Sequence, residues 1–343
     1  MEYGLGQEGA GVSTAFDPAE PAPAPSRLCV PPELAGLRAD VYLFRELPSL
    51  SRSRIRQKIQ MGESLLNGRR YSTATRLRAG DVISVTWRGV PQRGPCPDLE
   101  VLFEDGHLLA VNKPPGVASH QMGKRQSGTV VQFARLRFEA AIRESLGRGD
   151  ASFYPTLVNR LDVFTSGVVL IAKTRAVYKA MQALIARHLV FREYVALVEG
   201  VMHDDEGLIE LPLGPDTASR VRLKMAFRSD GRMSSTRYSI IERLPGHTIV
   251  LVRPLTGRQH QIRVHLAALG HPVVGDLLYK DEALFLAAQG TMGESVDLPV
   301  PRHCLHARMA SFTHPVTGEP VQVQARVPAD FESVVNGLRL PKR

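Results

Sequence analysis

The chain has 343 residues, of which 43% are hydrophobic and 22% charged, and 43 Lys and Arg against 34 Asp and Glu give a net charge of +9. This length suggests two or three folded units, and the ordinary composition excludes a largely disordered or collagen-like chain. No apolar run reaches the ~20 residues of a membrane span, and the N-terminus lacks the pattern of a secretory signal. Three scattered cysteines predict no disulfide framework. We therefore expect a cytoplasmic protein that does not associate with membranes.

The positive charge is concentrated in one short region. Residues 1–26 contain four acids and no Lys or Arg, residues 27–93 contain 13 Lys and Arg against five acids, and the remainder contains 30 against 25. A small, strongly basic unit is typical of a module that binds phosphate groups. A solvated basic surface that only favours solubility explains the charge alone equally well.

The first elements belong to a tail and two helices. Residues 1–26 are rich in Ala, Gly and Pro, which predicts a disordered tail. Residues 37–61 space their apolar side chains as two short helices do, and Ser51 or Ser53 is expected to cap the second helix.

Strand signals follow these helices. A short apolar run leads into an Asn67-Gly68 turn, and a turn at residues 79–81 leads into an alternating strand. Residues 27–89 are therefore expected to form a small α+β domain, and the Pro- and Gly-rich residues 90–98 a linker.

The larger unit, residues 99–335, contains more strand patterns than helix patterns. Several strands follow one another directly, which predicts an α+β fold whose mixed, mainly antiparallel sheet is flanked by helices. The expected strands are 99–104, 107–112, 168–173, 193–199, 235–242, 247–253, 309–313 and one near 320–326; the expected helices are 129–145, 175–188 and 261–269.

Asp162 stands out as a candidate for chemistry. It follows Arg160-Leu161 and precedes a Thr165-Ser166-Gly167 turn that leads into a buried strand. An acid at the mouth of a strand, beside a cation, can stay ionised and act as a nucleophile or base. Taken alone, the same pattern more often marks an Asp that only pairs with Arg160 or caps a turn.

Histidines raise the question of a metal site. His260 and His265 are five residues apart, which places them on different faces of a helix, and no Cys or acidic ligand completes a set with His271, His303 or His306. We expect no metal, and histidines that bind RNA or stabilise the fold. No Gly-rich phosphate loop follows a strand, so no nucleotide cofactor is expected.

A series of ordered motifs resembles the RluA family of pseudouridine synthases. The central motif is Asn159-Arg160-Leu161-Asp162, two variable residues and Thr165-Ser166-Gly167, where the family usually has His in place of Asn159. A second departure is Gln259, where Thr or Ser is usual. The other matching segments are Asn112-Lys113-Pro114, Glu193-Tyr194, Leu255-Thr256-Gly257-Arg258, 260–265, Gly275-Asp276, Leu305-His306-Ala307 and His314-Pro315.

The N-terminal domain is similar to the RNA-binding domain typified by ribosomal protein S-four, through residues 51–54, Asn67-Gly68 and Gly80-Asp81. This resemblance implies that the domain holds RNA through its phosphates. The second predicted helix carries the basic side chains expected to make these contacts: Arg52, Arg54, Arg56 and Lys58.

The RluA resemblance implies isomerisation of uridine to pseudouridine in RNA without a cofactor. Asp162 maps onto the catalytic carboxylate, which stabilises or captures positive charge on the sugar, attacks the base, or transfers protons. Tyr194 maps onto a tyrosine that stacks on uracil and assists proton movement. Arg263 maps onto the arginine that pairs with the catalytic acid.

The remaining expected contacts are with substrate. Arg160 is expected either to fill the space left by the flipped base or to contact a phosphate. We expect Lys113 to line the cleft, and His260 and Gln261 to face the substrate.

The expected partner is RNA, with large-subunit ribosomal RNA first and transfer RNA second, and the expected state is a monomer. Two other functions remain as alternatives. One is a non-catalytic RNA-binding or ribosome-assembly factor. The other is a nucleoside or sugar hydrolase, for which the sequence offers no second carboxylate.

Overall fold

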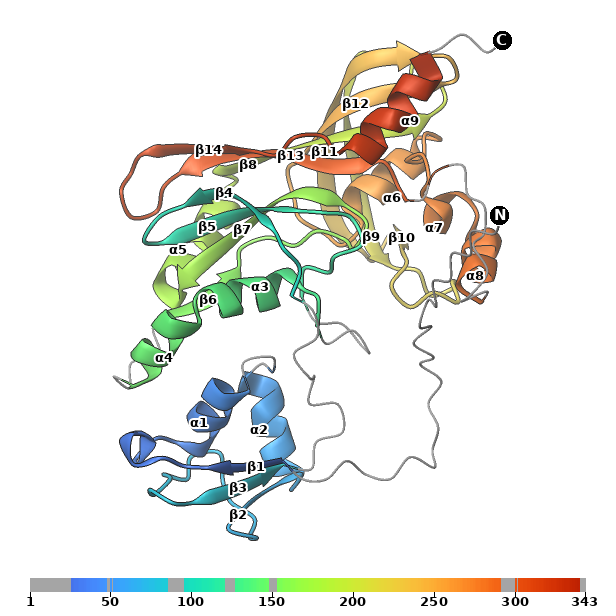
Figure 1. Cartoon of the computed structure of the whole chain (residues 1–343). Helices are drawn as coiled ribbons and strands as arrows, with labels where there is room; N and C mark the ends of the chain where they lie inside the picture. The colour runs from blue at the N-terminus through green and yellow to red at the C-terminus, as the bar shows by residue number, and fades with distance from the viewer. Residues whose placement is uncertain are drawn as a thin grey trace, which may run out of the picture. The chain divides into compact units, whose positions relative to one another are not determined.

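The computed structural model describes residues 26–47, 50, 52–85, 96–120, 127–147, 153–290, 300 and 302–339 (Figure 1). The chain divides into two compact units, Met1–Val90 and Pro91–Arg343. The tail expected over residues 1–26 lies outside the described residues except for Ser26. Residues 90–95 of the expected linker lie outside them as well.

The small unit packs two helices on a three-stranded antiparallel sheet of order β1-β3-β2 (Figure 1). Fully buried Leu43, Ile55 and Ile83 join the two layers, as the helical and strand spacing predicted. The first strand was not predicted from the sequence. The elements are β1 (Ser26–Cys29), the 3-10 helix η1 (Pro32–Leu34), α1 (Ala39–Glu46), α2 (Arg52–Gln60), β2 (Ser64–Leu66) and β3 (Val82–Val85).

The structure tests one of the two capping residues expected for α2. Ser53 is the second residue of this helix, so it does not occupy the capping position before the first turn. Ser51 lies outside the described residues.

The large unit is built on one mixed sheet of 11 strands among the described residues, which confirms the predicted α+β class. The main path runs β10-β9-β11-β12-β8-β13-β7-β5-β4, with β14 paired to β13 and β6 to β7. The strands are β4 (Glu100–Glu104), β5 (Leu108–Lys113), β6 (Phe153–Leu157), β7 (Ser166–Thr174), β8 (Val190–Glu199), β9 (Glu206–Pro215), β10 (Met225–Phe227), β11 (Arg232–Leu244), β12 (His247–Pro254), β13 (Leu305–Thr313) and β14 (Pro320–Gln324).

The helices of this unit lie on both faces of the sheet (Figure 1). The helix expected over 129–145 is two helices, because the first ends at Arg137 and Phe138 is its C-cap. The helices are α3 (Val130–Arg137), α4 (Glu139–Gly147), α5 (Arg175–Ala186), α6 (Gln261–Ala268), α7 (Leu277–Lys280), α8 (Glu282–Gly290) and α9 (Ala329–Arg339).

Strand β7, which lies between β13 and β5, is buried on both faces. Val169 and Ile171 belong to the core beneath α3, α6 and α9, whereas Val168 and Leu170 belong to the core beneath α5. A strand buried on both sides reads as a continuous apolar run, as residues 168–172 do. The loop before β7 is therefore attached to a strand that is buried on both faces.

The Thr165-Ser166-Gly167 segment joins β7 to β13 in a short parallel pairing. Gly167 has a φ of 113°, and a Cβ at this position would lie 2.1 Å from the carbonyl oxygen of Ala307, so only glycine fits. Ser166 Oγ lies 2.9 Å from Nδ1 of His306. This close pairing fixes the start of β7 and, with it, the loop that carries Asp162.

Candidate active site

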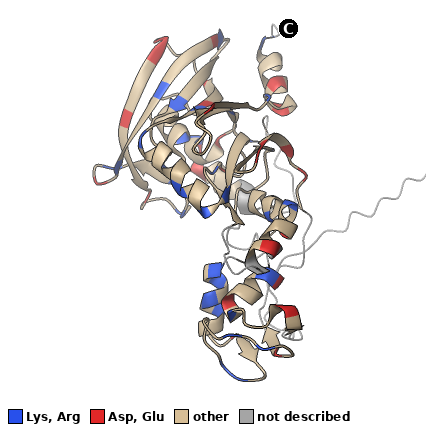
Figure 2. Cartoon of the chain, turned by 90° about the vertical axis from the view of Figure 1, so that its left-hand side faces the viewer, with Lys and Arg blue, Asp and Glu red and all other residues tan. Residues whose placement is uncertain are grey.

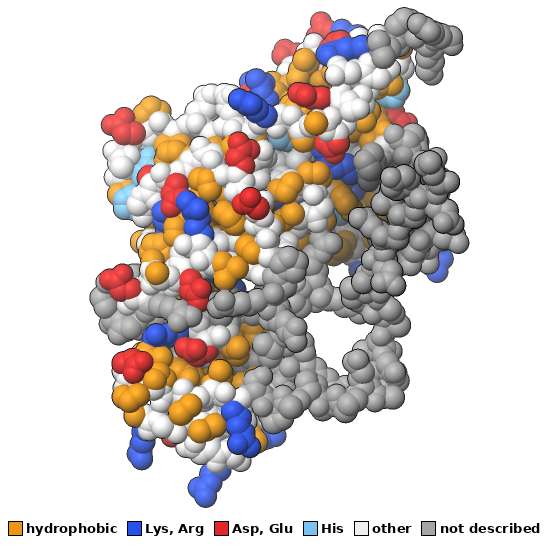
Figure 3. Space-filling model, in the orientation of Figure 1, with side chains coloured by type: hydrophobic (Ala, Val, Ile, Leu, Met, Phe, Trp, Pro, Cys, Tyr) orange, Lys and Arg blue, Asp and Glu red, His pale blue; other side chains and the backbone are white. Residues whose placement is uncertain are grey.

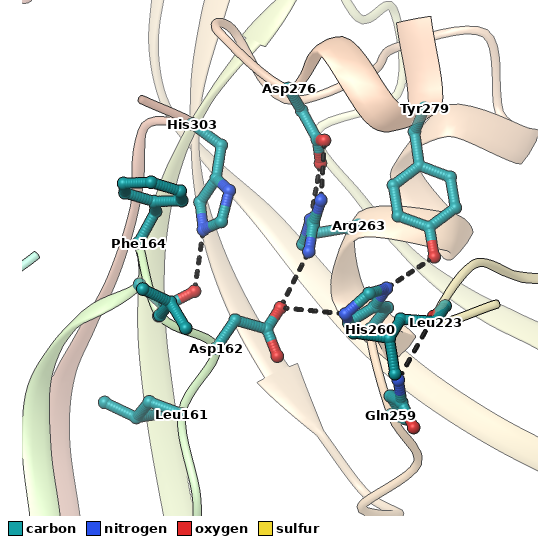
Figure 4. A network of polar contacts seen from close by, with 12 residues as sticks. Leu161, Asp162, Phe164, Leu223, Gln259, His260, Arg263, Asp276, Tyr279 and His303 are labelled. Carbon is teal, nitrogen blue, oxygen red and sulfur yellow. Dashed lines mark hydrogen bonds and ion pairs between the residues drawn. The ribbon is translucent and has the colours of Figure 1, made fainter. Parts of the chain in front are cut away.

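Asp162 lies in the loop between β6 and β7, in the network drawn in Figure 4. The N–H of Thr165 donates to the carbonyl oxygen of Asp162 at 3.1 Å, which closes a tight turn around the acid. The side chain of Asp162 is 27% exposed. Its carboxylate is thus held from the protein side and open to a ligand on the other.

Arg263, in the first turn of α6, forms an ion pair with Asp162. Its Nη1 donates to Oδ2 of Asp162 at 2.9 Å, while Nε and Nη2 donate to the two carboxylate oxygens of Asp276 at 2.6 and 2.7 Å. Burial alone would lower the pKa of Arg263, but the hydrogen bonds and charge of Asp276, together with Asp162, raise it. Arg263 therefore remains a cation whose orientation is fixed by Asp276.

His260 approaches the same carboxylate from the residue before α6. Its Nε2 lies 3.9 Å from Oδ2 of Asp162, and its Nδ1 lies 2.7 Å from the hydroxyl of Tyr279 (Figure 4). That hydroxyl accepts the N–H of Met225, so its own proton can go to Nδ1 and leave the imidazole proton on Nε2. Burial lowers the pKa of His260 despite the opposing charge of Asp162. A neutral imidazole thus presents an N–H towards the acid.

Tyr194 lies on β8 and is 7% exposed. Burial raises the pKa of its phenol, and the negative charge of Asp162 raises it further. The phenol therefore stays protonated at neutral pH beside the candidate acid. The structure brings Asp162, Arg263, His260 and Tyr194 together, from a loop, a helix and a strand.

Two exposed side chains flank Asp162 in its own loop. Arg160 is exposed. Burial of His120 lowers the pKa of that histidine, and the positive charge of Arg160 lowers it further. Phe164 is 50% exposed and meets His303 edge-on, with ring centroids 6.4 Å apart. Both are accessible to a large substrate that approaches the carboxylate.

Lys113 does not line an open cleft, contrary to our expectation. It is fully buried, and its Nζ donates to the carbonyl oxygens of Pro114, Val117 and Val163 at 3.0, 2.8 and 2.9 Å. These contacts satisfy the three donors of an ammonium group. Lys113 instead ties the loop after β5 to the residue that follows Asp162.

Gln261 was expected to face the substrate, but the structure gives it a different role. Its Oε1 accepts the hydroxyl of Thr256 at 2.8 Å and the N–H of Arg258 at 2.9 Å. Its Nε2 donates to the carbonyl of Ser235 and the hydroxyl of Thr236. With the side chain 4% exposed, these bonds fix the start of α6 to β11.

Sequence reasoning missed Asp276, Tyr279, His303 and Arg302 as parts of the site. Nε2 of His303 lies 2.8 Å from Oγ1 of Thr165, and burial lowers the pKa of His303 well below 6.5. Arg302 Nη1 donates to the carbonyl of Phe164 at 3.2 Å. Asp276 belongs to the Gly275-Asp276 motif, and the Leu305-His306-Ala307 motif follows Arg302 and His303. These family motifs were the signal that could have pointed to the site.

The two departures from the family pattern both have local partners. Oδ1 of Asn159 accepts the N–H of Leu170 at 2.7 Å and its Nδ2 donates to the carbonyl of Val168 at 3.2 Å, so Asn159 extends the pairing of β7. Nε2 of Gln259 donates to the carbonyl of Leu223 at 3.1 Å.

The basic residues expected to contact RNA lie in the small unit, on α2. Arg54 is exposed. Lys58 pairs with Glu63 at 2.5 Å, and Arg52 pairs with the buried Asp40. Figure 2 marks the charged positions of both units on the ribbon, and Figure 3 colours the side chains on one face by type.

No group of three or more His, Cys, Asp or Glu among the described residues could hold a metal ion. None of the helices they form is both long and apolar enough to span a membrane.

The geometry is suited to charge stabilisation. Arg263 and Asp276 are 7% and 1% exposed, so Asp162 is the most accessible member of this ionic network. A carboxylate in this setting stays available to an electron-poor carbon or to a proton.

Comparison with known proteins gives relatives of this chain in sequence and in fold. Residues 107–268 match the family model described as RNA pseudouridylate synthase. The ribosomal large subunit pseudouridine synthase D of Xanthomonas campestris is 37% identical over 90% of this chain and 91% of its own, and synthase C of Vibrio vulnificus is 32% identical over 90% and 94%. The solved structure of human RNA pseudouridylate synthase domain containing 1 is 25% identical, with a TM-score of 0.52 over 73% of this chain and 98% of its own. The chain therefore belongs to the RluA family of RNA pseudouridine synthases, and it is an enzyme that isomerises uridine in RNA.

Proposed function

We propose that this enzyme isomerises uridine in large-subunit ribosomal RNA and that Asp162 is its catalytic carboxylate. The observation that carries the assignment is the position of Asp162, held at 2.9 Å by a buried arginine and still 27% exposed. Support for ribosomal RNA comes from relatives that are named for it and align over about nine-tenths of the chain.

The reaction changes which atom of uracil is bonded to the sugar. The bond between C1′ and N1 breaks, the base turns over, and a bond forms between C1′ and C5; C5 loses a proton and N1 gains one. Positive charge develops at C1′ while the base departs, and the carboxylate of Asp162 stabilises or captures it. Arg263 keeps that carboxylate ionised and oriented throughout.

Other side chains of the site have supporting roles in this proposal. Tyr194 stacks on the uracil, and its raised pKa keeps the hydroxyl available as a donor. Exposed Arg160 enters the space that the flipped uridine leaves, which offsets part of the cost of unstacking. His260 directs its Nε2–H towards Oδ2 of Asp162, the oxygen that Arg263 also contacts.

The small unit acts as an RNA-binding domain of the ribosomal protein S-four type in this proposal. Its basic character supports this role, since residues 27–93 carry 13 Lys and Arg against five acids. We further propose a monomer, because each unit has its own buried core. A cytoplasmic location is proposed because the relatives are named for ribosomal RNA.

The test is a map of pseudouridine in cellular RNA from a deletion strain that carries wild type, Asp162→Asn or a control, Asp230→Asn. Asp230 is an exposed carboxylate that pairs with Arg228. We expect wild type and the control to restore a pseudouridine in large-subunit ribosomal RNA, and Asp162→Asn to leave it absent.

The other outcomes contradict parts of the proposal. Restoration by Asp162→Asn would overturn the role of the carboxylate and favour a non-catalytic binding factor. A missing pseudouridine confined to transfer RNA would overturn the choice of substrate. Free uracil released by the purified protein would indicate a hydrolase.

A further inference from the structure

Asp40 of the small unit is a buried carboxylate surrounded by arginines. Its side chain is 0% exposed, although it lies in the first turn of α1 near the surface. Arg38 donates through Nε to Oδ1 at 3.1 Å, and Arg52 and Arg56 donate through Nε to Oδ2 at 3.2 and 2.8 Å. Two arginines of α2 and the residue before α1 therefore converge on one acid of α1.

The outer ends of these arginines remain available. Their side chains are 40%, 38% and 46% exposed. Each binds Asp40 through Nε, and Arg52 also brings its terminal Nη2 to 3.2 Å from Oδ2. No described residue other than Asp40 accepts a side-chain hydrogen bond from Arg38, Arg52 or Arg56. Arg38 and Arg56 bind Asp40 through Nε and present their two terminal nitrogens, and Arg52 presents Nη1. Terminal guanidinium nitrogens are the donors that match a phosphate.

The local charge is unbalanced. Three guanidinium groups face one carboxylate, which leaves a surplus of two positive charges in a small volume. Burial would raise the pKa of Asp40, but hydrogen bonds from Arg38 and Arg56 and the charge of Arg52 lower it, so the acid stays ionised. Lys58, on the same helix, differs because Glu63 neutralises it.

We propose that Asp40 assembles Arg38, Arg52 and Arg56 into a binding site for the phosphate backbone of RNA. This inference rests on the proposed RNA-binding role of the small unit and makes it specific. Free arginines lose side-chain entropy when they bind a phosphate, whereas these three are already oriented. The contacts fix the position of the RNA without selecting its sequence.

The proposal has a consequence that net charge alone would not predict. Replacing Asp40 with Asn makes the unit more positive by one charge, which strengthens a diffuse attraction for RNA. An oriented site loses its organiser in the same variant. The two ideas therefore predict opposite changes in affinity.

The first experiment compares two double variants of the full chain that lose the same charge. Arg52→Gln/Arg56→Gln removes two members of the site, and Arg69→Gln/Arg78→Gln removes two exposed arginines that have no contact with Asp40. Binding of a fluorescein-labelled RNA hairpin is measured by anisotropy over a series of KCl concentrations.

We expect the first double variant to weaken binding roughly tenfold and to reduce the slope of log affinity against log salt by about two. The control should change affinity by no more than about twofold. Equal losses in the two variants would indicate a diffuse basic surface, and no loss in the first would exclude the site; either result overturns the proposal.

Asp40→Asn supplies the second test. We expect it to weaken binding of the same hairpin at least roughly threefold, because the arginines lose their common acceptor. Tighter binding would overturn the organising role of Asp40. Circular dichroism shows whether the unit remains folded; if it does not, the arginine variants, which alter exposed side chains, decide the question.

These outcomes are independent of the catalytic assignment. The hairpin assay detects binding and not isomerisation, so a failure of the Asp162→Asn test would leave its result unchanged. Conversely, loss of the phosphate site should raise the RNA concentration that the enzyme needs, while Asp162→Asn should abolish turnover at every RNA concentration.

Discussion

Arg263 and Asp276 form a two-pronged ion pair, with Nε–Oδ2 and Nη2–Oδ1 distances of 2.6 and 2.7 Å, and both side chains are almost completely buried. The pair fixes the plane of the guanidinium. Its third nitrogen, Nη1, must then face Asp162. The carboxylate that we propose as catalytic is therefore positioned by a second acid, Asp276, whose own side chain is 1% exposed.

Asp276→Asn should impair both stability and catalysis. It leaves the buried charge of Arg263 without its partner, which should lower the free energy of unfolding by about 3–5 kcal/mol. The freed guanidinium would also shift away from Asp162, and kcat should fall about a hundredfold. Thermal unfolding and single-turnover kinetics measure the two effects. Asp230→Asn, at an exposed pair, should change neither, and unimpaired kcat in Asp276→Asn would show that Arg263 does not depend on Asp276.

Tyr279→Phe should affect turnover more than RNA binding. The variant removes the hydroxyl that lies 2.7 Å from Nδ1 of His260, so the imidazole no longer holds its proton on Nε2. We expect kcat to fall about tenfold with little change in KM. A rise in KM at unchanged kcat would instead place Tyr279 in substrate binding.

Lys113→Met should mainly destabilise the protein. The variant leaves the three carbonyl groups that contact the buried Lys113 ammonium without their donor, and the free energy of unfolding should fall by about 3 kcal/mol or more. Thermal unfolding measures this loss. A variant of unchanged stability but raised KM would mean that Lys113 contacts the substrate directly.

Stability should fall when the pH is lowered from about 7 to about 5. Burial lowers the pKa of His265 and of His306 to about 4. The unfolded chain therefore binds more protons than the folded one between about pH 6.5 and about pH 4, and each histidine removes about 1.4 kcal/mol per pH unit there. Urea unfolding at several pH values measures the slope.

The histidine contribution can be isolated by substitution. His306→Asn should reduce the pH slope of stability, whatever its effect on stability at pH 7. His203→Asn, at an exposed position, is the matched control and should leave the slope unchanged. An equal slope in wild type and His306→Asn would contradict the assignment.

The parts of the fold that could be predicted are those with a local signal. The apolar run of β7 and the alternating pattern of β11 each predict a strand. The family motifs lead to Asp162 and Arg263. Strand β9 was missed because Gly207 and Pro212 disfavour a strand, and only its pairing with β10 and β11 forms it.

The misjudged side chains depend on tertiary contacts. Nothing in the sequence near Lys113 shows that Val163, 50 residues away, supplies one of its acceptors. Asp276 likewise becomes important only where the loop before α7 meets α6. Such partners are set by packing, which local patterns do not encode.

The pairing of β7 with β13 also has a consequence for synthesis of the chain. Thr165 must wait for His303, 138 residues later, before its turn is held. The last described strand of the small unit, by contrast, ends at Val85. Domains fold in order as they emerge from the ribosome. The small unit, which is proposed to bind RNA, can therefore fold before the loop that carries Asp162 is held in place.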